Sequence, residues 1–282
     1  PYPVMMILRV LEGFAHLSIV VAAPTLMAAV AVGKDIPVAM GLWGTFFGVG
    51  FALAAFVFPY LGSTSGILWA NAVAIVGLAA ALAWTLPTSN RSGGDGQSFI
   101  ARHIAIYSNP SLVAPAIGFF AHTLVFLGLL TFLPERLGAW TATLLPLIAL
   151  VGTFGAGFLA RRIAPKSIMI FAFALSVVGM ASAAFIPDPM RIWIVLPLMA
   201  VIGLVPGAAF ANVPYLNADS QRQALANGAI AQLGTVGTAA SVPMFAAALQ
   251  FGFIGMSAVF VVISTLGLVA VWVIHKKIAL QQ

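Results

Sequence analysis

The sequence has 282 residues, of which 62% are hydrophobic and only 6% are charged, and its mean hydropathy is +1.11. Soluble domains carry about a quarter charged residues, so this composition excludes a soluble protein and indicates an integral membrane protein. The net charge of +6 does not indicate nucleic-acid binding, because the basic residues stand singly at the ends of apolar segments and form no patch.

Nine apolar segments follow one another along the chain. A spanning helix needs about 20 mostly apolar residues, and the turn-rich sequences 59–66 and 250–255 divide the two longest uncharged stretches. The sequence therefore predicts an all-α polytopic membrane protein with about nine transmembrane helices. They are expected near residues 4–27, 38–60, 67–86, 111–133, 141–160, 167–186, 192–213, 225–249 and 255–275.

One long polar stretch, Thr85 to His103, follows the third apolar segment and precedes the other six. Many transporters consist of two six-helix repeats joined by a polar linker, with the substrate path between the repeats. We therefore predict that residues 1–86 are half of an N-terminal bundle, 87–110 a cytoplasmic linker and 111–282 a complete C-terminal bundle. Three further N-terminal helices are expected to precede this sequence.

The basic residues of the connections are distributed unequally between the two membrane sides. Nine alternating spans assign nine Lys and Arg residues to one side and only Arg136 and Arg191 to the other, and the positive-inside rule makes the richer side cytoplasmic. The prediction is a multi-pass protein of the plasma membrane, bacterial by expectation, with the linker and the C-terminus in the cytoplasm. The nine residues are Lys34, Arg91, Arg102, Arg161, Arg162, Lys166, Arg222, Lys276 and Lys277.

Three ionisable residues, Arg9, Glu12 and His16, share one face of the first predicted helix. At about 100° per residue they lie within about 60° of one another. Charged groups at membrane depth are costly and mark pathways or proton relays. Arg9 is a fixed charge and Glu12 can titrate, so this face could carry a proton or hold an anionic substrate. The alternative is that Arg9 extends to the headgroups and Glu12 only pairs with it.

Other polar residues within the predicted spans are candidates for a substrate cavity. His122, Asn212, Asn227 and Gln232 need hydrogen-bond partners in a medium without water. Either they line a cavity or they form hydrogen bonds between helices, and the sequence leaves both interpretations open. The four His and six acidic residues form no metal-ligand cluster, and the absence of cysteine excludes thiolate chemistry, so neither a metal nor a cofactor is predicted.

Local motifs resemble the major facilitator superfamily over the whole chain, from that family's fourth helix to its twelfth. Residues 8–16 resemble the fourth-helix pattern, in which Arg is followed three and four residues later by Gln and Gly. Arg9 and Gly13 match, and Glu12 replaces Gln. The resemblance implies a role for Arg9 in proton coupling. Residues 44–53 follow an antiporter pattern only partly, because Val49 replaces its proline.

Residues 157–166 resemble the family's cytoplasmic Gly-x-Leu-Ala-Asp-Arg-x-Gly-Arg-Arg loop. Arg161 stands where the pattern has Asp, which puts a gating salt bridge through that Asp in question. The resemblance implies that Gly157, Arg161, Arg162 and Lys166 belong to a gating loop.

Together these features predict a transporter and not an enzyme, which moves a small-molecule solute through the lipid bilayer by alternating access, with protons as the expected coupling ion. The alternatives are a passive channel or a non-transporting membrane module or fragment. The sequence shows no ring of like charges and no filter loop typical of a channel. It also lacks the motifs of a membrane-embedded hydrolase.

Overall fold

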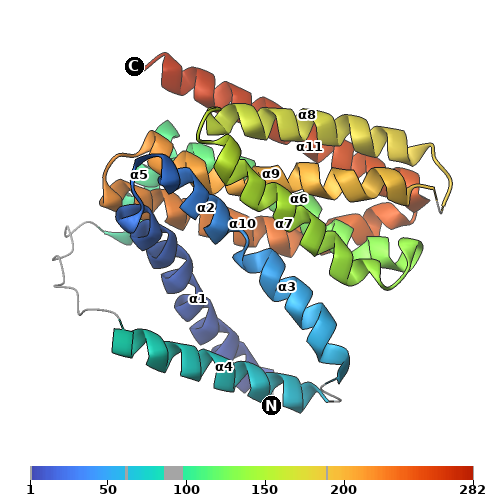
Figure 1. The fold of residues 1–282 in the computed structure, drawn as a ribbon, viewed down its shortest axis with the longest axis horizontal. Coiled ribbons are helices and arrows are strands. Elements are labelled where there is room, and N and C mark those ends of the chain that lie inside the picture. Colours follow the sequence, from blue (N-terminus) through green and yellow to red (C-terminus); the bar gives the residue numbers. More distant parts are fainter. Residues whose placement is uncertain (1, 61–62, 86–97, 189, 282) are drawn as a thin grey trace.

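The computed structural model describes residues 2–60, 63–85, 98–188 and 190–281, and all regular structure within them is helical (Figure 1). Successive long helices run back and forth, so alternate connections lie at the same end of the bundle. The helices are α1 (Tyr2–Val30), η1 (Gly33–Asp35), α2 (Ile36–Gly44), α3 (Phe46–Val57), η2 (Phe58–Tyr60), α4 (Thr64–Thr85), α5 (Phe99–Ser108), α6 (Pro110–Leu137), α7 (Thr141–Leu159), α8 (Pro165–Ala184), α9 (Ile192–Leu216), α10 (Ser220–Leu249) and α11 (Gly252–Ala279).

The predicted all-α polytopic fold is confirmed. Among the described residues, eight stretches are long and apolar enough to cross a membrane, one of them formed by residues 33–57 across η1, α2 and α3. The remaining predicted span corresponds to α4, which carries a shorter apolar stretch, Ser65–Ala81. Each of the nine apolar segments identified in the sequence is therefore helical in the structure.

The helix predicted at 38–60 is not continuous, which corrects the sequence-based boundary. The chain turns at Thr45, where both the backbone N–H and the side-chain hydroxyl donate to the carbonyl of Leu42, at 3.1 and 2.7 Å. A carbonyl three residues back is the acceptor of a tighter turn than the α-helix. The segment is therefore divided into α2 and α3.

The predicted linker 87–110 contains a helix that hydropathy alone did not indicate. Residues 86–97 lie outside the described part of the chain, and α5 follows them. Ser98 caps its start by accepting a hydrogen bond from the N–H of Ala101, 3.2 Å away. Asn109 is extended before Pro110 and caps α6 through its bond with Ser111, because a residue preceding proline avoids the helical conformation. One short polar junction thus ends α5 and starts α6.

The main hydrophobic core lies within α6 to α11. Its largest fully buried side chains include Phe173, Phe245 and Phe260. A second, smaller cluster joins this bundle to the N-terminal helices through Ala28 of α1 and Met40 of α2. Helix α1 packs against α10, α2 against α7 and α9, and α3 against α7, whereas α4 has no extensive contact with another described helix (Figure 1). Helices α1, α2 and α3 therefore pack against a bundle, α6 to α11, that has its own hydrophobic core.

Candidate functional site

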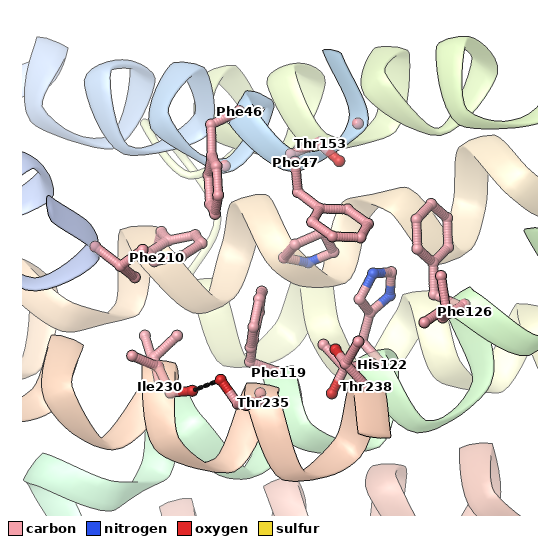
Figure 2. Close-up of a pocket in the computed structure, with 18 of the residues that line it drawn as sticks. Phe46, Phe47, Phe119, His122, Phe126, Thr153, Phe210, Ile230, Thr235 and Thr238 are labelled. Atoms are coloured by element: carbon pink, nitrogen blue, oxygen red, sulfur yellow. Dashed lines mark hydrogen bonds between the residues drawn. The ribbon is translucent and has the colours of Figure 1, made fainter. Parts of the chain in front are cut away.

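A cavity of about 640 Å³ lies where the N-terminal helices meet the α6–α11 bundle. Its walls come from α1, α2 and α3 on one side and from α6, α7, α9 and α10 on the other. Most of the wall is apolar and much of it is aromatic, and Figure 2 shows these rings around one space. The aromatic side chains are Phe46, Phe47, Phe119, Phe126 and Phe210, with the imidazoles of His16 and His122 beside them.

The aromatic rings of the wall contact one another in ordered geometries. Phe119 and Phe210 meet edge to face with their ring centroids 5.4 Å apart. His122 stacks on Phe126 at 4.7 Å and lies 6.2 Å from Phe119. Such pairs stabilise beyond the area they bury. The wall from Phe210 to Phe126 is therefore held in place by its own ring contacts.

His122 is 4% exposed, and it lines the cavity together with Pro206 of the facing helix α9. Pro206 has no N–H, so the carbonyl of Ile202, four residues earlier, lacks its usual helical donor. The Nδ1 atom of His122 is buried and has no partner among the described residues. The ring is therefore almost fully enclosed, and its Nδ1 is shielded from the cavity.

Three threonines of the cavity wall donate their hydroxyl protons to backbone carbonyls. Thr123 donates to Phe120, Thr235 to Ala231 (Figure 2) and Thr153 to Gly203, at 2.8 to 2.9 Å. A hydroxyl has a single proton, so each of these oxygens can offer only lone pairs to anything else. These three hydroxyls therefore offer acceptors to the cavity, whereas His16, Gln232 and Thr238 add groups that can donate.

At one end of the cavity, polar contacts join the two groups of helices. Arg161, which follows α7, forms an ion pair of 2.5 Å with Asp35, and its Nε donates to the carbonyl of Lys34 at 3.2 Å. Asn227 on α10 donates to the hydroxyl of Thr25 on α1, at 3.1 Å. Each of these residues lies beyond the cavity-lining part of its helix, in the same direction. The cavity is therefore closed at this end.

Close backbone packing between α2 and α7 reinforces the closed end. A Cβ atom added at Gly41 would lie 2.9 Å from the Cα of Gly157, and one added at Gly157 would lie 2.7 Å from the carbonyl oxygen of Pro37. Side chains larger than hydrogen do not fit there. Small residues allow this approach of helices, as they do generally in membranes.

At the other end the two groups of helices diverge. The described side chains of α1 before residue 20 are mostly exposed, whereas Val20, Pro24 and Ala28 are buried. Figure 1 shows the first half of α1, together with α4, lying away from α6 to α11. Access to the cavity is therefore possible from this end.

The three ionisable residues predicted on the first helix all lie on α1, and of their described side chains that of His16 reaches the cavity. His16 lines it, and Glu12 is exposed one turn earlier in the helix. The side chain of Arg9 lies outside the described part of the structure.

The other predicted polar residues occupy different places. His122 and Gln232 line the cavity, and Gln232 also joins α10 to α5: its Oε1 accepts from Tyr107 at 2.7 Å and its Nε2 lies 3.0 Å from His103. Partial burial raises the pKa of Tyr107, so its hydroxyl keeps the proton that it donates.

Asn212 and Asn227 are buried but are not among the residues that line the cavity. Asn212 bonds His275 of α11, with 3.0 Å between its Nδ2 and the ring Nε2, while the ring Nδ1 donates to the carbonyl of Val271. Asn227 bonds Thr25 as described above. Both asparagines therefore form hydrogen bonds between helices, one of the two interpretations that the sequence allowed.

The predicted gating loop lies at the closed end of the cavity. Gly157 packs on α2 and Arg161 pairs with Asp35, whereas Arg162 is exposed and Lys166 is partly exposed. Arg161 occupies the position where the loop pattern has Asp, and its partner Asp35 is an acid. In this protein the loop therefore supplies the basic residue of the pair, whereas the loop pattern would supply the acidic one.

Sequence reasoning missed two groups of residues that shape this site. The phenylalanines were not singled out, because an apolar helix offers many and only packing shows which face a cavity. Asp35 was likewise overlooked, although it is one of only six acidic residues in the chain and stands next to a turn. Acidic residues are scarce in this apolar sequence, and that scarcity could have indicated that Asp35 has a partner.

The sequence signature of the Major Facilitator Superfamily matches residues 1–242, which is most of the chain. The chain belongs to the Major Facilitator Superfamily. Membership in this superfamily confirms the predicted family and makes the protein a secondary transporter of a small molecule in a lipid bilayer, not an enzyme. No curated protein matches the chain. In this superfamily member, a cavity between two groups of helices is the natural candidate for the solute site.

Proposed function

We propose that this superfamily member transports its solute by alternating access, with residues 1–86 and 111–282 as parts of two bundles that rock around the aromatic cavity. The observation that carries the proposal is the asymmetry of that cavity. One end is closed by the Arg161–Asp35 pair and by glycine packing between α2 and α7, and at the other end the helices diverge. Contacts of this kind can break and re-form as units when the bundles move.

The closed end is the cytoplasmic one in this proposal. The connections next to Arg161 carry Lys34, Arg162 and Lys166, and the positive-inside rule places such connections in the cytoplasm. The membrane is the plasma membrane, and the described conformation faces outward.

Protons are the proposed coupling ion. Glu12 and His16 stand one helical turn apart on α1, and His16 borders the cavity, so a proton on either one changes the charge near a bound solute. A proton can drive the cycle only if it binds the outward and inward states with different affinities. In this proposal the packing of α1 against α10 is the contact that changes between the two states.

Single-cysteine labelling tests the proposal without knowledge of the solute. These 282 residues contain no cysteine, so Thr235→Cys on the cavity wall introduces one thiol. In the full protein, reconstituted in vesicles, we expect a membrane-impermeant maleimide to label this thiol from either side, with rates that shift in opposite directions when a pH gradient is imposed. Glu12→Gln should abolish that shift while leaving insertion intact.

The outcomes separate the proposal from its alternatives. A channel would be labelled from both sides with rates that rise and fall together, and a non-transporting module would be labelled from one side only. Either pattern would refute alternating access. A pH-dependent shift that persists in Glu12→Gln, with His16→Gln as the matched variant one turn away, would refute the role of Glu12.

A further inference from the structure

Basic residues that stand apart in the sequence come together at one end of the fold. Helix α8 packs along α11 and runs in the opposite direction, so the start of α8 lies beside the C-terminal end of α11 (Figure 1). The two helices meet at Gly118 of α6, where an added Cβ atom would lie 2.7 Å from Met169 of α8 and 3.3 Å from Val271 of α11. Lys166 stands three residues before Met169, and Lys276 stands five residues after Val271, toward the same end. We call the residues gathered there the basic surface: Arg162, Lys166, Lys276 and Lys277.

The positive charge of the basic surface is not neutralised within the described part of the protein. Of the described acidic residues at this end, Asp35 pairs with Arg161, and Asp219 lies 4.0 Å from Arg222. No ion pair between described residues includes a member of the basic surface. Three of its four residues are exposed and Lys166 is partly exposed. Like charges held close together repel one another, so this surface favours a bound anion.

Apolar side chains of α11 continue from the basic surface into the membrane-spanning part of the helix. The ring of Trp272 is 53% exposed, and the Nζ atom of Lys276 lies 5.3 Å from its centre. Exposed tryptophans are enriched at the level of the lipid headgroups. Lys277, Val273 and Val269 are spaced four residues apart and therefore share one face of α11, and both valines are exposed. A cation above an exposed apolar face matches a phosphate joined to an acyl chain.

We propose that the basic surface binds the phosphate of an anionic phospholipid from the surrounding bilayer, while an acyl chain lies along Val273 and Val269 of α11. A zwitterionic lipid fits less well, because its headgroup ammonium would face four cations. The positive-inside rule requires basic connections but does not require residues of two separate segments to meet on one surface. Basic surfaces between membrane helices are suited to bind anionic headgroups. This lipid site is separate from the cavity.

Two lipids that differ in headgroup charge test the inference. The full protein in a non-ionic detergent is titrated with dioleoyl phosphatidylglycerol, which is anionic, or with dioleoyl phosphatidylcholine, which is zwitterionic. Native mass spectrometry counts the bound lipids and gives the affinity of the first one. Each basic residue near an anionic headgroup contributes about fivefold in affinity. We therefore expect phosphatidylglycerol to bind at least about tenfold more tightly than phosphatidylcholine.

Substitutions in the last turn of α11 locate the site. Lys276→Gln combined with Lys277→Gln should weaken phosphatidylglycerol binding about 25-fold. The same variant should keep its binding of phosphatidylcholine, which shows that the protein is folded. Lys276→Arg combined with Lys277→Arg keeps both charges and should keep the preference. Arg136→Gln is the matched control, because Arg136 is an exposed basic residue in the last turn of α6, at the opposite end of the bundle.

Three results would overturn the inference: equal binding of the two lipids, a preference for phosphatidylglycerol that survives in the double Gln variant, or an equal loss of that preference in Arg136→Gln. Glycerol 3-phosphate, which lacks the acyl chains, distinguishes a lipid from a soluble phosphate. It should not displace phosphatidylglycerol at equal concentration, and displacement would refute the role of the acyl chain. The assay uses neither a solute nor a pH gradient, so its outcome is independent of the labelling test of alternating access.

Discussion

Replacing Gly152 with Ala should destabilise the protein strongly, because this glycine sets the distance between α7 and α9. A Cβ atom at Gly152 would lie 1.8 Å from the carbonyl oxygen of Ala200, and one at Gly203 would lie 2.2 Å from that of Ala149. Real Cβ contacts are essentially never below 3.0 Å, so the two helices must separate by roughly 1 Å. Both atoms that obstruct are backbone, so no side-chain rotation can relieve the overlap.

The size of the effect follows from the packing and the hydrogen bond that the extra methyl group disturbs. Forcing such a group into a packed interior costs about 1–3 kcal/mol. Separating the helices also weakens the 2.8 Å bond from Thr153 to the carbonyl of Gly203, worth about 1 kcal/mol. We therefore expect Gly152→Ala to lower the free energy of unfolding by about 2–4 kcal/mol.

Gly155 provides a matched control on the same helix. It lies three residues further along α7, and a Cβ atom there would meet nothing within 4 Å. Gly155→Ala should be neutral, or stabilising by up to about 1 kcal/mol through helix propensity. Unfolding by SDS in mixed micelles, followed by tryptophan fluorescence, compares the two variants. Equal midpoints for Gly152→Ala and Gly155→Ala would refute the close contact between α7 and α9.

Three further predictions concern polar contacts. Reversing one charge of the Arg161–Asp35 pair should raise cytoplasmic labelling of the cavity cysteine two- to fivefold, since a partly exposed pair contributes about 0.5–1 kcal/mol. Exchanging the two residues should restore the original labelling rate. An exchanged variant that is still labelled faster would contradict the role of the pair in closing the cavity. Arg191→Leu should destabilise the protein by about 1–3 kcal/mol in the same unfolding assay, because this buried guanidinium lies 3.6 Å from the centre of the Phe253 ring and donates to the carbonyl of Ala183. Arg191→Lys should also be destabilising, because an ammonium group does not reproduce both contacts. Tyr107→Phe should cost about 0.5–1.5 kcal/mol by removing the donor to Gln232, and an unchanged midpoint would show that the bond is not formed in solution.

Hydropathy predicted the membrane helices well because the cost of burying a charge in lipid acts on each segment separately. The interruption at Thr45 was not predictable in this way. The turn depends on a hydroxyl that bonds Leu42, and threonines commonly make such bonds without ending a helix. Helix α5 was missed because it is short and because Arg102 and His103 interrupt its apolar residues.

The candidate site was harder to predict than the helices. His122 and Asn212 look equivalent in sequence, as single polar residues in apolar helices. The rotation of each helix decides that His122 faces the cavity while Asn212 faces α11. The pairing of Arg161 with Asp35 joins residues 126 positions apart, so it depends on packing that periodicity does not specify. The sequence could therefore identify the candidate polar residues, but it could not separate those that line the cavity from those that form hydrogen bonds between helices.

The location of the core has a consequence for how the protein is made. Helices α1, α2 and α3 find their partners in α7, α9 and α10, all of which emerge later from the ribosome. During biosynthesis these three helices are therefore inserted before α7, α9 and α10 exist, and the faces that later contact those helices are not yet covered by them. Time spent in that state is an opportunity for quality-control proteases. A delay in synthesis after residue 85 should increase degradation more than an equal delay after residue 249.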